Sequence, residues 1–174
     1  MLVNLSDVLT SEGNNMNLEI PLEMTEFDGG TGVFEITEKS PVILKISNVE
    51  ADKAKIEGKV KVIFRTACDR CLAEVPTSLD LEFERLVTSP EIASEDEAVD
   101  DLSFMEGYQL NVETFVYNEI IGSWPAKILC KEDCKGLCPV CGQDRNEREC
   151  GCDTFVPDPR MAAIKDIFNA KREV

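Results

Sequence analysis

Cysteine is the residue type in this sequence with the clearest chemistry, and most of its copies lie in one short stretch. Cys138 and Cys141 are separated by two residues and followed by Gly142, which is the form of a zinc knuckle. The Cys150-Gly-Cys152 pair follows after a short excursion. Four thiolates at about 2.3 Å from one ion form a closed tetrahedral Zn²⁺ site. The spacing therefore predicts a first metal site made of Cys138, Cys141, Cys150 and Cys152.

The other four cysteines form a second candidate site, with Cys68, Cys71, Cys130 and Cys134 as ligands. This site would join a C-x-x-C pair to a segment about sixty residues later. One alternative groups Cys134 with Cys138, Cys141 and one of the last two cysteines. A second alternative is that these four cysteines bind no metal and remain two reduced pairs. In a third, Cys68 and Cys71 form a redox-active pair, although no βαβ pattern surrounds them.

The expected cofactor is zinc, with two Zn²⁺ per chain, although cysteine spacing alone does not separate zinc from an iron–sulfur cluster. Two sites saturated by protein thiolates leave no position for a reacting water, which is the arrangement of structural zinc. The sequence therefore predicts metal sites that hold the fold in shape and no catalytic residues.

Composition excludes several functions. The 174 residues include 34 Asp and Glu against 18 Lys and Arg, for a formal net charge of −16, and no histidine. A Ser-His-Asp triad, a Cys-His dyad and an HExxH zinc protease are excluded, and the negative balance argues against broad nucleic-acid binding. No signal peptide and no membrane-spanning run is recognisable, so we expect a cytoplasmic protein with reduced thiols and without a membrane partner or a small-molecule substrate.

A long antiparallel hairpin is the element expected to position the C-x-x-C pair. Residues 53–65 and 75–84 both alternate with a period of two, and the pair lies between them. The first strand exposes a cationic stripe that could contact RNA or a partner. We favour ion pairs with the acidic face of the second strand. The cations, with one more beside the cysteines, are Lys53, Lys55, Lys59, Lys61, Arg65 and Arg70.

The whole chain is predicted to be α+β. An antiparallel β-sheet, which could roll partly into a barrel, carries one packing helix that begins after Asn111. Residues 91–106 are expected to form a solvated acidic loop, and a terminal helix is expected from Asp158-Pro159. The predicted domains are a β-rich main domain over 1–126, a zinc ribbon over 127–157 and the C-terminal helix over 158–174.

Two motifs, CDRCL at 68–72 and CKGLCPVCG at 134–142, together with Cys150-Gly-Cys152 and Asp158-Pro159-Arg160, resemble the bacterial YceD family. The family carries the description "large ribosomal RNA subunit accumulation protein". The resemblance implies a non-enzymatic factor in large ribosomal subunit biogenesis. It implies as partners the large-subunit ribosomal RNA precursor or a basic ribosomal or assembly protein, and the net charge favours the protein. The alternatives are a zinc-ribbon interaction module unrelated to ribosomes and a thiol oxidoreductase that uses Cys68 and Cys71.

Overall fold

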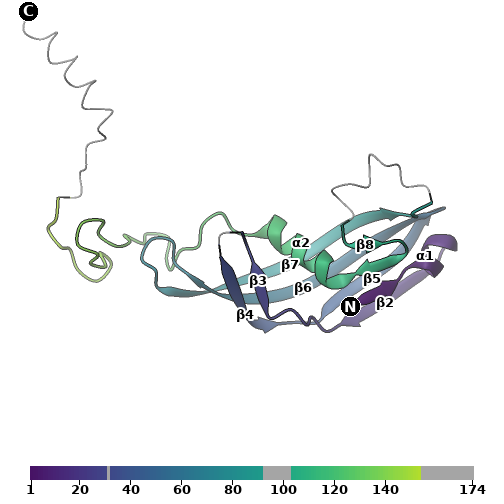
Figure 1. The fold of residues 1–174 in the computed structure, drawn as a ribbon, viewed down its shortest axis with the longest axis horizontal. Coiled ribbons are helices and arrows are strands. Elements are labelled where there is room, and N and C mark those ends of the chain that lie inside the picture. Colours follow the sequence, from purple (N-terminus) through teal and green to yellow (C-terminus); the bar gives the residue numbers. More distant parts are fainter. Residues whose placement is uncertain (31, 92–102, 154–174) are drawn as a thin grey trace, which may run out of the picture.

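The computed structural model describes residues 1–30, 32–91 and 103–153, and Figure 1 shows its ribbon. The described part is a mainly antiparallel β structure with two helices, which agrees with the predicted α+β class. The elements in chain order are β1 (Leu2–Asn4), α1 (Ser6–Thr10), β2 (Asn15–Ile20), β3 (Glu26–Asp28), β4 (Val33–Lys39), β5 (Val42–Glu50), β6 (Lys53–Ala67), β7 (Glu74–Thr88), β8 (Met105–Glu106), β9 (Gln109–Asn111) and α2 (Val112–Ser123).

The predicted hairpin is confirmed, and it is the longest feature of the sheet. Strands β6 and β7 pair antiparallel along their whole length, from Lys53 opposite Thr88 to Ala67 opposite Glu74. Along the other edge of β6, β5 pairs with its first half and β4 with its second half. Strand β2 pairs with β5 and strand β3 pairs with β4, and the sheet is open, not closed into a barrel.

One glycine of β6 is required by packing. Gly58 lies opposite Phe83 in the register of the hairpin, and the Phe83 ring lies directly over the Gly58 backbone. A methyl group at position 58 would overlap that ring. The ring then meets Phe115 of α2 edge-on, with centroids 5.0 Å apart, so the missing side chain makes room for a contact between the sheet and α2.

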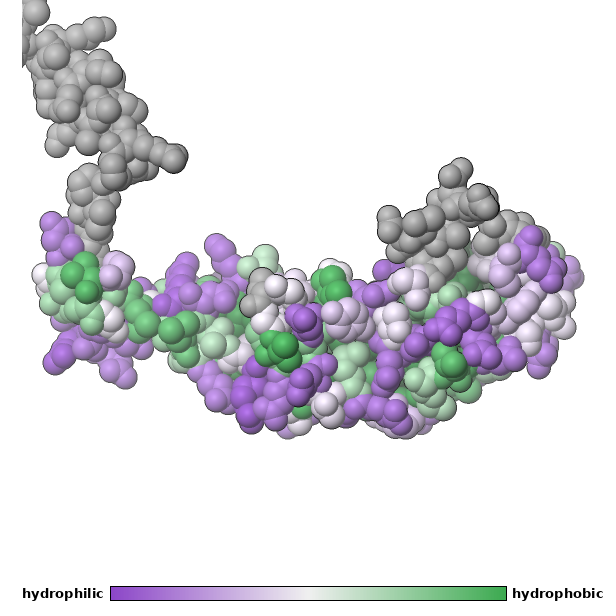
Figure 2. Space-filling model, viewed as in Figure 1, coloured by the Kyte–Doolittle hydropathy of each residue, from purple (hydrophilic) through white to green (hydrophobic). Residues whose placement is uncertain are grey.

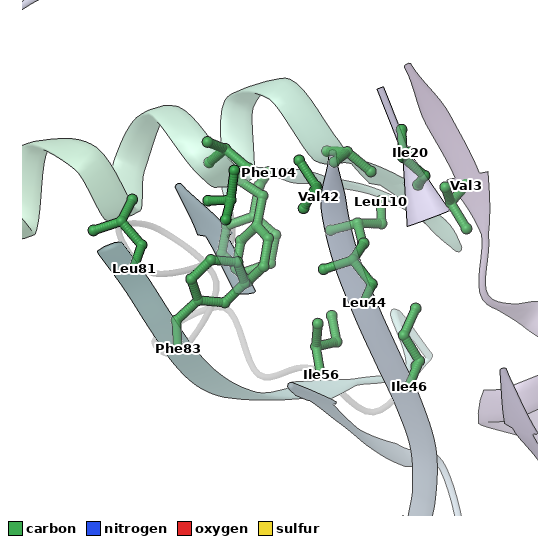
Figure 3. Close-up of a cluster of buried hydrophobic side chains, with 14 of the residues drawn as sticks. Val3, Ile20, Val42, Leu44, Ile46, Ile56, Leu81, Phe83, Phe104 and Leu110 are labelled. Carbon is green, nitrogen blue, oxygen red and sulfur yellow. The ribbon is translucent and has the colours of Figure 1, made fainter. Parts of the chain in front are cut away.

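Helix α2 begins where the sequence predicts. The Asn111 side chain accepts a hydrogen bond from the Thr114 backbone N–H at 3.3 Å and so caps the first turn. The apolar stripe at positions 112, 115, 116 and 120 is buried. It packs over the core that the sheet supplies, as Figure 3 shows for residues that include Leu44, Ile56 and Phe83. Trp124, just past the end of α2, packs against three phenylalanine rings.

The structure differs from the sequence prediction near the N-terminus and in the acidic segment. Residues Leu2–Asn4 and Ser6–Thr10 form a strand and a helix where the prediction had only later strands. Strand β1 joins β9 and β8 in a separate three-stranded sheet. Phe104 lies within the segment predicted to be a solvated loop, yet it is only 3% exposed and packs on Phe115.

The predicted C-terminal helix and residues 92–102 of the acidic segment lie outside the described residues. Among the residues that the structure describes, neither helix is long and apolar enough to cross a membrane.

Candidate metal centres

All eight cysteines lie at one end of the molecule. Residues 127–153, here called the cysteine arm, continue from the exit of α2 and lie next to the β6–β7 turn, far from α1 (Figure 1). The arm consists of turns and a single isolated β-bridge between Leu137 and Asp144. Hydrophobic residues run along the visible face of this narrow part (Figure 2). Something other than regular secondary structure must therefore hold the arm in shape.

The cysteines gather in two groups of four. The hairpin group contains Cys68, Cys71, Cys130 and Cys134, and the arm group contains Cys138, Cys141, Cys150 and Cys152. Within each group all four sulfur atoms lie within 4.8 Å of one another. These are the two sets that the spacing predicts, and the alternative that moves Cys134 to the other set does not match the geometry.

The sulfur positions fit a tetrahedral metal. Thiolates at about 2.3 Å from a central ion stand about 3.8 Å from one another. In the hairpin group the sulfurs of Cys68 and Cys134 are 3.8 Å apart, and those of Cys71 and Cys130 are 3.5 Å apart. Every candidate ligand in both groups is a cysteine sulfur, and four such sulfurs are the donor set of structural zinc and of iron–sulfur clusters.

The same backbone turn presents two ligands in each group. In residues 68–73, the Cys68 N–H donates to Ala73 O at 2.8 Å and the Leu72 N–H donates to Cys68 O at 2.9 Å. In residues 138–143, Cys138 and Gly142 donate to the corresponding carbonyls at 2.8 Å each. We call these turns the first and second knuckle. Each needs a left-handed residue after its second cysteine, and Leu72 has φ 61° where Gly142 has φ 75°.

The knuckles also set the electrostatics of their first sulfur. Burial raises the pKa of Cys68, but backbone N–H groups, including those of Arg70 and Cys71, donate to its sulfur and lower the pKa to about 6. Backbone N–H groups of Cys141 and Val140 likewise lower the pKa of Cys138 to about 6. These two thiols are ready to ionise and to bind a cation.

In each group one other cysteine, Cys130 or Cys152, has a pKa that is raised and not lowered. Hydrogen bonds from Cys130 to the sulfurs of Cys71 and Cys134 raise the pKa of Cys130 to about 12. Contacts with Cys141 and Cys150 do the same for Cys152. Four packed thiols cannot all ionise without a cation among them, and a dication relieves this repulsion.

The hairpin group is anchored to the body by the residues between its ligands. The Asp69 N–H donates to Ile128 O at 2.8 Å, and the Ile128 N–H donates to the Asp69 carboxylate at 2.7 Å. Ile128 is 8% exposed. These two bonds tie the start of the cysteine arm to the first knuckle.

Sequence reasoning missed one polar side chain at the hairpin group. The Asn146 amide donates to the Cys134 sulfur at 3.3 Å, although Asn146 lies between Cys141 and Cys150 of the other group. The local signal was present, because Asp144 and Asn146 form an Asx turn in which the Asp144 carboxylate accepts from the Asn146 N–H at 2.7 Å. The contact with Cys134 depends on tertiary structure, which the sequence pattern does not give.

The cationic residues proposed to contact RNA or a partner all have partners within the chain. The cross-strand ion pairs that the alternation predicts are present: Lys59 with Glu82 at 2.5 Å and Lys61 with Asp80 at 3.6 Å are two of them. The Arg70 guanidinium donates to Cys134 O at 2.7 Å. Contact with RNA or a partner stays a prediction for these six. The others pair as follows: Lys53 with Glu50, Lys55 with Glu57 and Glu84, and Arg65 with Glu35 and Glu74.

Fold and site together define a β-sheet protein with two four-thiol centres at one end, and comparison with known proteins identifies its family. The family model "Large ribosomal RNA subunit accumulation protein YceD" matches residues 56–168, a range that contains both cysteine groups. The chain belongs to the YceD family.

A relative from Arabidopsis thaliana is called "Large ribosomal RNA subunit accumulation protein YCED homolog 1, chloroplastic". It is 22% identical over 177 aligned positions, which cover 84% of this chain and 52% of the relative. The chain therefore spans about half the length of that relative. No solved structure gives a significant match.

Proposed function

We propose that this protein is a non-enzymatic factor in large ribosomal subunit biogenesis, needed for accumulation of large-subunit ribosomal RNA, and that it acts as a zinc-stapled binding scaffold. The observation that carries the proposal is the family match, which runs from β6 to beyond the last cysteine. The name of the plant relative refers to the same RNA. Both thiol groups lie within the matched range.

The proposed role of the metal is structural. Zinc bound by the two groups would crosslink the hairpin turn to the cysteine arm and fold the arm on itself. Four protein sulfurs complete the coordination of a tetrahedral ion, so neither centre offers a place for a substrate. This favours a scaffold over a thiol oxidoreductase, because Cys68 and Cys71 would both be ligands.

A basic ribosomal or assembly protein is the partner that the charges favour. The cationic stripe is ion-paired to acidic side chains of the same sheet, so it offers few free charges to phosphates. The net charge of −16 adds a long-range attraction for cationic partners. A salt titration separates the two partners, because RNA bound through phosphates loses affinity steeply and linearly on a log–log plot. Tight RNA binding with a steep slope would overturn the preference for protein.

The decisive experiment is genetic depletion followed by complementation. Depletion should lower the ratio of large-subunit to small-subunit ribosomal RNA, and the wild-type chain should restore it. Cys138→Ser, which removes one ligand, should restore it poorly. Ser78→Ala, at an exposed position of β7, should restore it fully. The wild-type protein should also sediment with precursors of the large subunit. An unchanged RNA ratio after depletion, with no such sedimentation, would favour an interaction module unrelated to ribosomes.

A further inference from the structure

The two thiol centres are in physical contact through one asparagine. Asn146 belongs to the loop that the arm group closes, since it lies between ligands Cys141 and Cys150. Its side chain nevertheless reaches the hairpin group. The amide nitrogen donates to the Cys134 sulfur at 3.3 Å, and the amide oxygen accepts from the Lys135 N–H at 2.9 Å.

The position of Asn146 is set by the second knuckle. The Asp144 carboxylate accepts from both the backbone N–H and the side-chain amide of Asn146, at 2.7 and 2.8 Å. Asp144 in turn pairs with Leu137 in the β-bridge, beside ligand Cys138. The Arg145 N–H donates to Gly136 O at 3.0 Å. The loop that carries Asn146 is thus laid against the segment that carries Cys134.

A second connection runs from the backbone just before the second knuckle to the backbone of the first knuckle. The Leu137 N–H donates to Arg70 O at 2.9 Å, and the Arg70 side chain donates to Cys134 O at 2.7 Å. Gly136 makes this approach possible, because a Cβ there would lie 2.7 Å from Arg70 O, and its φ is 72°. The segment that joins Cys134 to the second knuckle is therefore packed directly on the first knuckle, and only two residues separate Cys134 from the bridge residue Leu137.

We infer that the two centres bind metal cooperatively, with metal in the arm group strengthening metal binding in the hairpin group through Asn146 as a positioning residue. The inference rests on the metal occupancy proposed above. Without metal in the arm group, the loop from 141 to 150 is held by a few hydrogen bonds at the surface, and Asn146 is free to leave Cys134. Losing an outer-shell hydrogen bond of this kind typically weakens metal affinity 10–100-fold. The coupling is reciprocal, as any linkage between binding sites must be.

Each centre has its own reporter in the full-length protein. Cys130 is an exposed ligand of the hairpin group and Cys141 an exposed ligand of the arm group. Alkylation in a series of zinc buffers, read at each cysteine by mass spectrometry, gives the free zinc concentration at which each becomes half-protected. We expect Asn146→Ala to raise the Cys130 midpoint about tenfold. Arg148→Ala is the matched control, because Arg148 lies in the same loop and its side chain donates a hydrogen bond to Gln143, and it should shift that midpoint less than about twofold.

Removal of the arm centre completes the test. The double variant C150S/C152S should raise the Cys130 midpoint at least as much as Asn146→Ala, and adding Asn146→Ala to it should change little more. A Cys130 midpoint unchanged in C150S/C152S, or effects that simply multiply, would overturn the coupling while leaving the proposed function in place. A wild-type chain in which zinc never protects Cys130 would remove the hairpin centre and the coupling with it, whereas the ribosomal role is tested separately by the RNA ratio.

Discussion

Removing the metal should unfold the cysteine arm and leave the sheet body folded. The apolar contribution of the arm is small: apart from its cysteines, Ile128, Leu129 and Leu137 are its side chains in or near the buried clusters. Together they contribute at most about 5–9 kcal/mol. Structural zinc contributes about 10–16 kcal/mol per site in small zinc domains, so the metals dominate the stability of the arm. The main core is a separate cluster made by the sheets, α1 and α2.

Limited trypsin digestion with a chelator measures this directly. Digestion should be rapid at the basic residues of the arm: Lys127, Lys131, Lys135, Arg145 and Arg148. Lys59 and Lys61 in β6 should stay protected, and the fluorescence of Trp124 should change little, because its three phenylalanine neighbours belong to the body. Chelator already saturated with zinc is the control and should leave the arm intact. Cleavage of β6 at the same rate as the arm would refute the reasoning and show that the hairpin centre supports the whole fold.

Three further predictions concern the body. In a urea titration, Gly58→Ala should lower the free energy of unfolding by about 1–3 kcal/mol, because the added methyl group overlaps the Phe83 ring. The control is Gly122→Ala, where the methyl group would lie in open space on α2, and this variant should be neutral or slightly stabilising. Equal effects of the two substitutions would contradict the packing argument. Asn111→Ala should cost about 1 kcal/mol through loss of the helix cap, seen as a lower melting temperature. Burial raises the pKa of Glu119, against the effect of Arg85, so its ionisation opposes folding above its unfolded-state pKa. Glu119→Gln should therefore stabilise the protein at neutral pH and have little effect below that pKa, and a loss of stability at neutral pH would show that the ion pair outweighs burial.

Local patterns were enough to predict the hairpin and α2. The alternation on both sides of Cys68 and Cys71 persists over many residues, and Asn111 precedes an apolar stripe of helical period. The two cysteine groups also follow from spacing, since a C-x-x-C turn aims both sulfurs at one point.

The parts that sequence reasoning missed depend on contacts between distant segments. Helix α1 has five residues and no side-chain cap at Leu5, so it offers little periodicity to recognise. Phe104 is one aromatic residue among acidic neighbours, and its burial depends on Phe115 of α2. The contact of Asn146 with Cys134 depends on Asp144, which the bridge to Leu137 places beside the second knuckle. The division of one edge of β6 between β4 and β5 likewise has no local signature.

The two centres differ in when they can form during synthesis of the chain. All four ligands of the arm group lie between residues 138 and 152, so one short emerging segment can complete that centre. The hairpin group spans ligands 59 and 66 positions apart, and its first two are made before β7 and α2 exist. A nascent chain therefore carries a half-built hairpin group through the synthesis of β7, β8, β9 and α2. The ribosome must release the start of the cysteine arm, up to Cys134, before the hairpin group at the β6–β7 turn receives its last two sulfurs.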